Sequence, residues 1–278
     1  MGYKIVVDSC CELPEHLRRD ERFQIIPLGL EVGEYHILDD DNFDQADFLA
    51  KVRACPVCPK SSCPSPEKYM EAYQTEAENV FVVTLSQKLS GSYNSAALGK
   101  RLYHEKYGDK NILVIDSKSA SCGEAQIALK AMELSEQGLD FAEISRQLLA
   151  YREEMNTYFV LDNLETLRKN GRLTGVKALV VSTLNIKPVM GADDGSIIQR
   201  SQAIGIKKAL TKMADIIAAE VKESGKKRLM ITHCNCQSRA ECMKKLLTDK
   251  MEFYDVMILD TAGISSMYAN DGGVIVTI

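Results

Sequence analysis

The sequence predicts a two-domain α/β protein. It should combine an N-terminal parallel sheet flanked by helices with a C-terminal α/β domain, and hold a ligand in the interdomain cleft. Apolar strand-like runs alternate with helix-like segments along the chain, which is typical of parallel crossover units. The chain has 278 residues, more than one average domain, and 45% of them are hydrophobic, which is enough for a substantial core. The cleft between the domains is the expected position of the site.

The N-terminal domain is expected to span residues 1–154 and to carry serine-rich loops. Pro66, behind Ser65, suits the first turn of a helix, and Gly138 suits the end of one. The expected strands lie near residues 3–8, 23–31, 80–84 and 111–115, with helices at 14–20, 44–54, 66–77, 92–106, 122–136 and 141–152 and a loop at 55–65.

The C-terminal domain is expected to span residues 155–278. It begins with the apolar strand Tyr158–Leu161, and the apolar stripe of the long helix 206–221 is spaced for core packing. The remaining elements are expected in the order of a short helix from Asn163, a loop at 170–175, a strand at 184–190, a strand at 228–232, a helix at 237–248 and strands at 255–259 and 274–277.

Serine residues follow three of the predicted strands directly. The strand ending at Asp8 runs into Ser9, the strand ending at Thr84 runs into Ser86 and Ser90, and the strand ending at Asp116 runs into Ser117 and Ser121. If these strands are parallel neighbours, the loops emerge at one edge of one sheet, where open α/β folds bind ligands. That edge would be rich in hydroxyl groups and nearly free of charge. The helix N-termini beside it favour the anionic end of a small molecule.

Composition excludes several classes of partner. The formal net charge is −5 and the pI about 5.5, so no basic surface for nucleic acid is expected. No apolar run is long enough for membrane insertion and the N-terminus enters a strand at once, so a cytoplasmic protein is expected. Nine cysteines without an export signal indicate reduced thiols. A zinc site built from Cys55, Cys58, Cys234 and Cys236 is a weaker alternative.

Six sequence blocks, in order, resemble the signatures of the DegV family of bacterial fatty-acid-binding proteins. A single Ser-Gly-Ser would be weak evidence, but six blocks spread over nearly the whole chain are strong evidence. The blocks are Asp8–Pro14, Ser61–Pro66, Leu89–Ala96, Asp116–Ser117 with Ser121 and Gly123, Leu164–Arg172, and Leu184–Pro188.

This resemblance implies a lipid-binding protein that holds one long-chain fatty acid. The carboxylate would lie among serine hydroxyls and backbone donors, and the acyl tail would lie in an apolar tunnel to which the C-terminal domain contributes. The bound fatty acid would be the only ligand, with no cofactor or metal and no catalytic residue. Some relatives present the acid to a fatty acid kinase. By position, the ligand-binding residues are Ser61, Ser62, Ser90, Gly91, Ser92 and Arg172.

Three positions depart from the family pattern. Cys63 stands where the family usually has glutamine, Met267 stands where a histidine closes over the head group, and Ile204 stands at a position that is arginine in many relatives. Tyr268 or Asn270 could supply a substitute donor. These departures leave open whether this chain serves a kinase.

Other functions remain alternatives from the residues alone. A serine hydrolase or another small-anion enzyme could use the same cleft, with a serine within reach of His233, although no Gly-x-Ser-x-Gly motif occurs. A protein-interaction module is a third alternative. The serines themselves have a structural interpretation, because Ser65, Ser92 and Ser121 stand near helix starts, where serine commonly caps. The strand-end residues Asp8 and Asp116 are expected to be structural, without a second carboxylate nearby.

Overall fold

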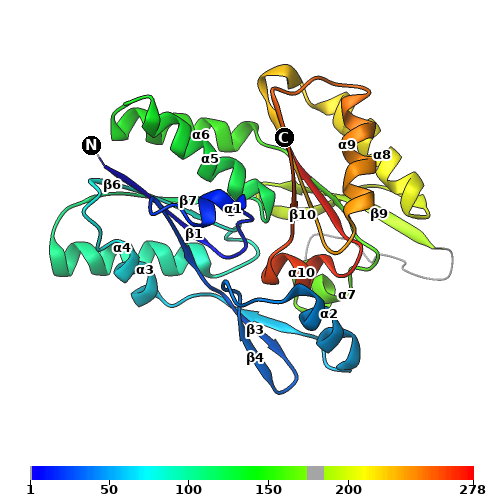
Figure 1. Ribbon diagram of the computed structural model, residues 1–278, viewed down its shortest axis with the longest axis horizontal. Helices are drawn as coiled ribbons and strands as arrows, with labels where there is room; N and C mark the ends of the chain where they lie inside the picture. Colours follow the sequence, from blue (N-terminus) through cyan, green and yellow to red (C-terminus); the bar gives the residue numbers. More distant parts are fainter. Residues whose placement is uncertain (1, 174–184) are drawn as a thin grey trace.

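The computed structural model describes residues 2–173 and 185–278, so residues 174–175 of the predicted loop and Leu184 of the predicted strand lie outside the described residues. Two main sheets lie side by side, the first in the N-terminal half of the chain and the second in the C-terminal half (Figure 1). The two-domain α/β fold class predicted from the sequence is confirmed.

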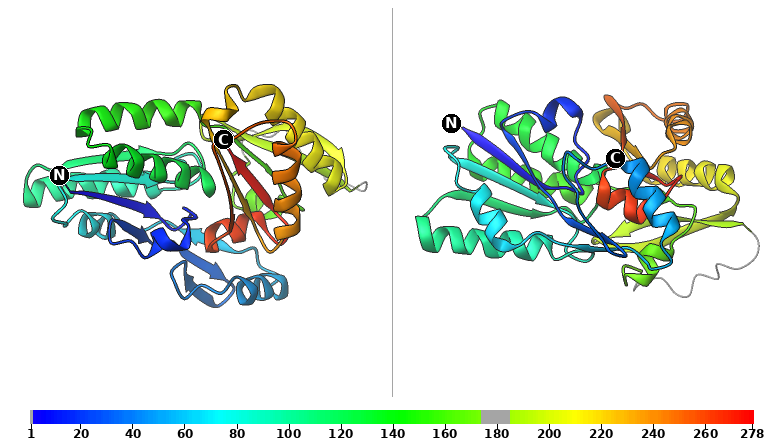
Figure 2. Two further views of the ribbon diagram at one scale, coloured as in Figure 1. Left: turned by 45° about the horizontal axis from the view of Figure 1, so that its top comes forward. Right: turned by 60° about the horizontal axis from the view of Figure 1, so that its bottom comes forward.

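The first sheet is parallel and has the strand order β2-β1-β6-β7. Its strands are β1 (Tyr3–Asp8), β2 (Phe23–Ile26), β6 (Asn79–Thr84) and β7 (Asn111–Asp116). Helices α3 (Pro66–Ala72) and α4 (Ser92–Tyr107) lie on one face, and α5 (Cys122–Glu136) and α6 (Phe141–Glu154) lie on the other (Figure 2). Every residue of β6 is buried, as expected for a central strand covered on both faces.

The second sheet is mixed and has the strand order β10-β9-β8-β13-β11-β12. Its strands are β8 (Thr157–Val160), β9 (Ile186–Asp193), β10 (Ser196–Ile204), β11 (Arg228–His233), β12 (Asp255–Asp260) and β13 (Val274–Thr277). Helices α8 (Ile206–Glu220) and α9 (Gln237–Thr248) pack against it, and α5 packs on β11 and β13. Because α5 contacts both sheets, it joins the two halves of the molecule.

A small antiparallel sheet with the order β4-β3-β5 projects from the first half (Figure 1). It comprises β3 (Gly29–Val32), β4 (Tyr35–Leu38) and β5 (Lys60–Ser62), and α2 (Gln45–Ala54) lies between β4 and β5 in the chain. The prediction of one strand over 23–31 is therefore wrong. Residues 27 and 28, the first of them a proline that cannot donate to a ladder, separate β2 from β3.

Three short α-helices, α1 (Glu15–Arg18), α7 (Glu165–Lys169) and α10 (Gly263–Ala269), and one turn of 3-10 helix (Ser224–Lys226) complete the described chain. The sequence did not predict β4, β5, β10 or α10. Helix α10 matters most for function, because it packs against α2 and α7 and carries Ser265 and Tyr268.

Candidate functional site

The serine loops lie together because their strands are neighbours. Strand β6 pairs in parallel with β1 on one side and with β7 on the other. The loops after Asp8, Thr84 and Asp116 therefore emerge at the same edge of the sheet, as predicted. The second sheet faces this edge, and a hydrogen bond from Ser86 Oγ to the carbonyl of Gly195, 2.8 Å long, links the two.

A cavity lies between this edge and the second sheet. About 830 Å³ of space in and around it is not filled by protein atoms, part of it open to solvent. Both halves of the chain line it, and most of its lining is apolar. The apolar side chains include Leu28, Leu85, Leu89, Phe159, Leu161, Leu167, Ile197, Ile264 and Ile275.

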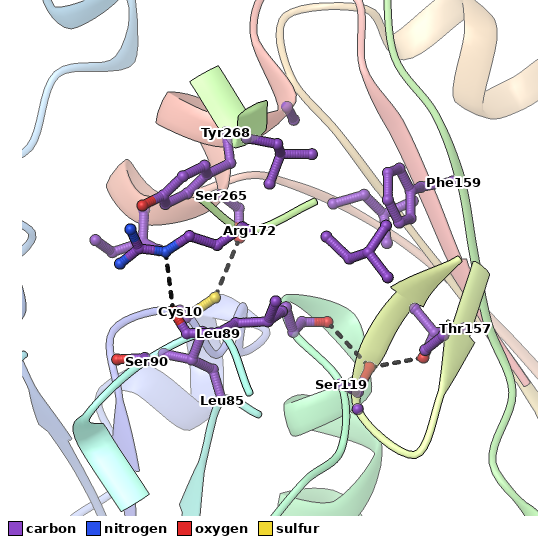
Figure 3. A pocket seen from close by; sticks show the side chains of 18 of the residues that line it. Cys10, Leu85, Leu89, Ser90, Ser119, Thr157, Phe159, Arg172, Ser265 and Tyr268 are labelled. Atoms are coloured by element: carbon purple, nitrogen blue, oxygen red, sulfur yellow. Dashed lines mark hydrogen bonds between the residues drawn. The ribbon is translucent and has the colours of Figure 1, made fainter. Parts of the chain in front are cut away.

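Polar side chains gather at one end of the cavity, called here the head end and defined by Ser61, Ser90, Arg172 and Tyr268. Figure 3 shows the Arg172 guanidinium between Tyr268 and the Leu89–Ser90 segment. Arg172 Nε donates to the Leu89 carbonyl at 3.1 Å, and the guanidinium carbon lies 5.9 Å from the centre of the Tyr268 ring. Ser61 Oγ and Tyr268 Oη are 3.0 Å apart. This end therefore offers a cation and several hydroxyl donors to an anion.

Three of the six predicted ligand-binding residues, Ser61, Ser90 and Arg172, line the cavity. Ser62 is the next residue along β5, so its side chain points to the opposite face, and its Oγ would lie 2.4 Å from a Cβ at Gly29.

The other two predicted residues, Ser92 and Gly91, support the loop that carries Ser90 and do not line the cavity. Ser92 is fully buried; its amide donates to Ser90 Oγ at 3.2 Å and its Oγ lies 3.1 Å from Ser90 Oγ. Gly91 permits a close approach, since a Cβ there would lie 2.9 Å from Cys63 Sγ.

Met267, which stands at the position of the family's histidine, belongs to the hydrophobic core. Met267 is 1% exposed and packs beside Leu28 and Leu30, while the adjacent Tyr268 lines the cavity. Burial raises the pKa of Tyr268, and the hydrogen bond with Ser61 and the charge of Arg172 partly oppose this shift. The phenol therefore stays protonated at neutral pH and can donate a hydrogen bond.

The expectation that this edge is nearly free of charge is wrong. Behind the serine loops lies a group of buried carboxyl side chains, called here the carboxyl layer: Asp8, Glu12, Asp39 and Glu124. Asp8 accepts from the amides of Cys10 at 3.1 Å and Leu85 at 3.0 Å, which fixes two of the loops. Burial raises the pKa of Asp8 to about 6, and burial together with the adjacent Asp8 raises the pKa of Glu124 well above its usual range. A second carboxyl group therefore does lie beside Asp8.

The other two carboxyl groups hold the start of α10. Asp39 accepts from the amides of Gly263 at 2.7 Å and Ile264 at 2.9 Å, and Glu12 accepts from the amide of Ala262 at 3.1 Å. Burial raises the pKa of Asp39 to about 6 and that of Glu12 to about 7. Residues of the first half thereby position the helix that carries Tyr268.

The geometry gives little support to a hydrolase. Ser121 lies on the turn from β7 to α5 with φ 61° and ψ −131°, a strained conformation at the position of a hydrolase nucleophile. Its hydroxyl is buried, however, and bonds Thr232 Oγ1 at 2.7 Å rather than facing the cavity. His233 Nδ1 lies 3.1 Å from Asp260 and accepts from the amide of Cys236.

Two further sequence hypotheses are not supported. Ser65 and Ser121 make no capping hydrogen bond through their side chains. Within residues 2–173 and 185–278, no three His, Cys, Asp or Glu side chains are grouped so that they could hold a metal ion.

Over the same residues, every helix falls short of the length and apolar character needed to cross a bilayer.

Comparison with known proteins agrees with the two-domain α/β fold. The model of the DegV family, described as an uncharacterised protein family, matches residues 3–277. A DegV domain-containing protein of Streptococcus pyogenes serotype M1 is 35% identical over 99% of this chain and 98% of its own length. The chain therefore belongs to the DegV family.

Solved structures of relatives share the whole fold. A DegV family protein from Ruminococcus gnavus, refined with vaccenic acid, is 50% identical, with a TM-score of 0.98 over 100% of this chain and 99% of its own. The Fatty Acid Kinase (Fak) B3 protein of Streptococcus pneumoniae, loaded with linoleic acid, is 32% identical, with a TM-score of 0.88 over 100% of this chain and 99% of its own.

Proposed function

We propose that this protein binds one long-chain fatty acid, with the carboxylate at the head end and the acyl tail in the apolar part of the cavity. The observation that carries the proposal is that most of the cavity wall is apolar, while Arg172 and three hydroxyl groups gather at the head end. The fatty acids in the related structures from R. gnavus and S. pneumoniae support the same ligand class.

In this proposal the tail supplies most of the affinity. Each buried methylene contributes about 0.8 kcal/mol, so about fifteen of them offer on the order of 12 kcal/mol before the cost of ordering the chain. Hydrogen bonds to a charged acceptor contribute about 1.5 to 3 kcal/mol each. The head end therefore fixes the position of the ligand and rejects hydrocarbons without a carboxylate.

Each predicted site residue has a role in this proposal. Ser61, Ser90, Arg172 and Tyr268 contact the carboxylate. Ser92 orients Ser90, while Ser62 and Gly91 shape the neighbouring backbone. Residues 1–154 and 155–278 form the two domains, and the cavity lies between them.

We further propose a binding protein rather than an enzyme, working in the cytoplasm without a cofactor and presenting its ligand to a fatty acid kinase. The similarity to the Fak B3 protein supports this role. Hydroxyl groups suit this role as well, because they can donate hydrogen bonds to the oxygens of either a carboxylate or an acyl phosphate.

Native mass spectrometry of the purified protein tests the proposal. A mass excess of one fatty acid is expected, lost on denaturation, and the delipidated protein should regain one equivalent of octadecanoic acid. A protein that carries no lipid and takes up no octadecanoic acid would contradict it.

A further inference from the structure

A second polar feature lies inside the apolar part of the cavity. Ser119, in the loop between β7 and α5, and Thr157, the first residue of β8, both line the cavity, and their hydroxyl oxygens are 2.7 Å apart. Figure 3 shows these two side chains pointing toward one another on the side of the cavity opposite Ser90 and Arg172. We call them the distal hydroxyl pair.

The local backbone does not depend on these hydroxyl groups. The amide of Ser119 donates to Ser117 Oγ at 3.1 Å, and its carbonyl accepts from the amide of Ser86 at 2.8 Å. Thr157 is held through the pairing of β8 with β13. A Cβ at Gly123 would lie 2.0 Å from Ser119 Oγ, so a glycine there leaves the space that this hydroxyl occupies.

The pair has unused capacity to accept hydrogen bonds. Two hydroxyls supply two protons and four lone pairs. One proton lies between the two oxygens, and Ser119 Oγ also lies 3.4 Å from the carbonyl of Ala120, which can take the other. When both protons are used in this way, the oxygens can still accept a hydrogen bond from a donor in the cavity, and an unsubstituted alkyl chain has no such donor.

We propose that the distal hydroxyl pair makes this protein selective for long-chain acids that carry a hydroxyl group in the distal half of the acyl chain. This inference rests on the proposed function and names its ligand class more narrowly. The ligand hydroxyl donates to the pair, while the carboxylate is held at the head end. Two polar anchors at opposite sides of an apolar cavity then fix the position of the substituent along the chain.

The competing explanation is a purely structural contact, because Ser119 and Thr157 belong to different halves of the molecule. Such a contact would contribute to stability and would be indifferent to the ligand. The test must therefore separate stability from ligand preference.

The experiment measures the affinity of the delipidated protein for octadecanoic acid and for its monohydroxylated isomers, with the hydroxyl moved carbon by carbon. One isomer with a distal hydroxyl should bind about fivefold more tightly than octadecanoic acid, the effect of one net hydrogen bond. The variant Ser119→Ala/Thr157→Val keeps the shapes and removes both hydroxyls, so it should lose this preference and bind octadecanoic acid within about twofold of the unmodified chain.

The remaining outcomes are distinct. If octadecanoic acid binds and no hydroxylated isomer is preferred, or the double variant keeps the preference, the selectivity is overturned and the proposed function stands. If neither acid binds, the proposed function itself fails. Thermal unfolding of the ligand-free double variant shows separately whether the hydroxyl pair contributes to stability. The variant Ser90→Ala, at the head end, should weaken the binding of octadecanoic acid and of the hydroxylated isomer by the same factor.

Discussion

The head end and the carboxyl layer are linked through the loop after β6, which carries Ser90 and whose Leu85 amide donates to Asp8, but they differ in burial and in charge. The head end presents hydroxyls and one guanidinium to the cavity. The carboxyl layer behind it holds four acidic side chains, each no more than 3% exposed. The carboxyl layer serves the backbone: Asp8 accepts from the amides of Cys10 and Leu85, and the adjacent Ser9 hydroxyl, also buried, accepts from the amide of Leu28 at 3.0 Å.

This difference explains how an acidic layer can stand close to a site for an anion. Buried charges that lie near one another interact strongly, so four ionised carboxylates would oppose a bound carboxylate. Burial raises the pKa of each of the four, and the adjacent Asp8 raises that of Glu124 further. The layer can therefore position loops and α10 without carrying its full negative charge.

The largest effect expected from this comparison is on stability as a function of pH. The folded pKa values of Asp8, Glu12 and Asp39 are about 6, 7 and 6, above their ordinary values, so the folded chain binds more protons than the unfolded chain between about pH 4 and 7. The free energy of unfolding should fall by about 5 kcal/mol as the pH rises from 5 to 8, because one pKa unit corresponds to about 1.4 kcal/mol. Denaturant titration of the ligand-free protein measures this change.

The variant Glu124→Gln serves as a control for that titration. The amide keeps the shape of a protonated carboxyl group and removes one of the buried groups whose pKa is raised, so that it no longer titrates. The pH dependence should be shallower than in the unmodified chain. A free energy of unfolding that increases between pH 5 and 8 would show that the carboxyl layer is ionised and stabilising, contrary to the assignment made here.

A smaller effect, on binding, is expected from filling the apolar part of the cavity. Ala192 on β9 lines the cavity, so Ala192→Phe should displace several methylene groups of a bound acid. At about 0.8 kcal/mol for each methylene, octadecanoic acid should bind about a hundredfold more weakly. Isothermal titration measures the loss, and Ala150→Phe on the exposed face of α6 is the matched control. Equal affinity for both variants would place the tail elsewhere.

The sequence predicted the part of the site that depends on regular structure. Apolar runs that end in serine predict parallel strands with loops at one edge, and β1, β6 and β7 have this arrangement. The predicted residues Ser61, Ser90 and Arg172 all line the cavity. The strand arrangement follows from local patterns that one stretch of chain contains in full, whereas Ser61 and Arg172 were predicted from the resemblance to the DegV family.

Features that depend on distant contacts were not predictable in the same way. Glu124 and Glu12 resemble ordinary surface residues in sequence, and only the packing of α5 and α10 buries them. The alternation of β5, which turns Ser62 away from the cavity, depends on pairing with β3, some thirty residues earlier. Thr157 becomes part of the cavity because the second sheet faces the first, and no sequence signal near residue 157 indicates this.

The smallest predicted effect compares the neighbouring side chains Ser61 and Ser62 with Ser90. Ser90→Ala removes a hydroxyl from the head end, so the affinity for octadecanoic acid should fall about tenfold, the effect of one hydrogen bond to a charged acceptor. Ser61→Ala should cost less, because Ser61 Oγ already bonds Tyr268 and that phenol can then turn to the ligand. Ser62→Ala should change nothing, since this side chain faces Gly29. A loss for Ser62→Ala with none for Ser61→Ala would mean that the register of β5 differs in the bound protein, because only a shift of one residue exchanges the two faces of a strand.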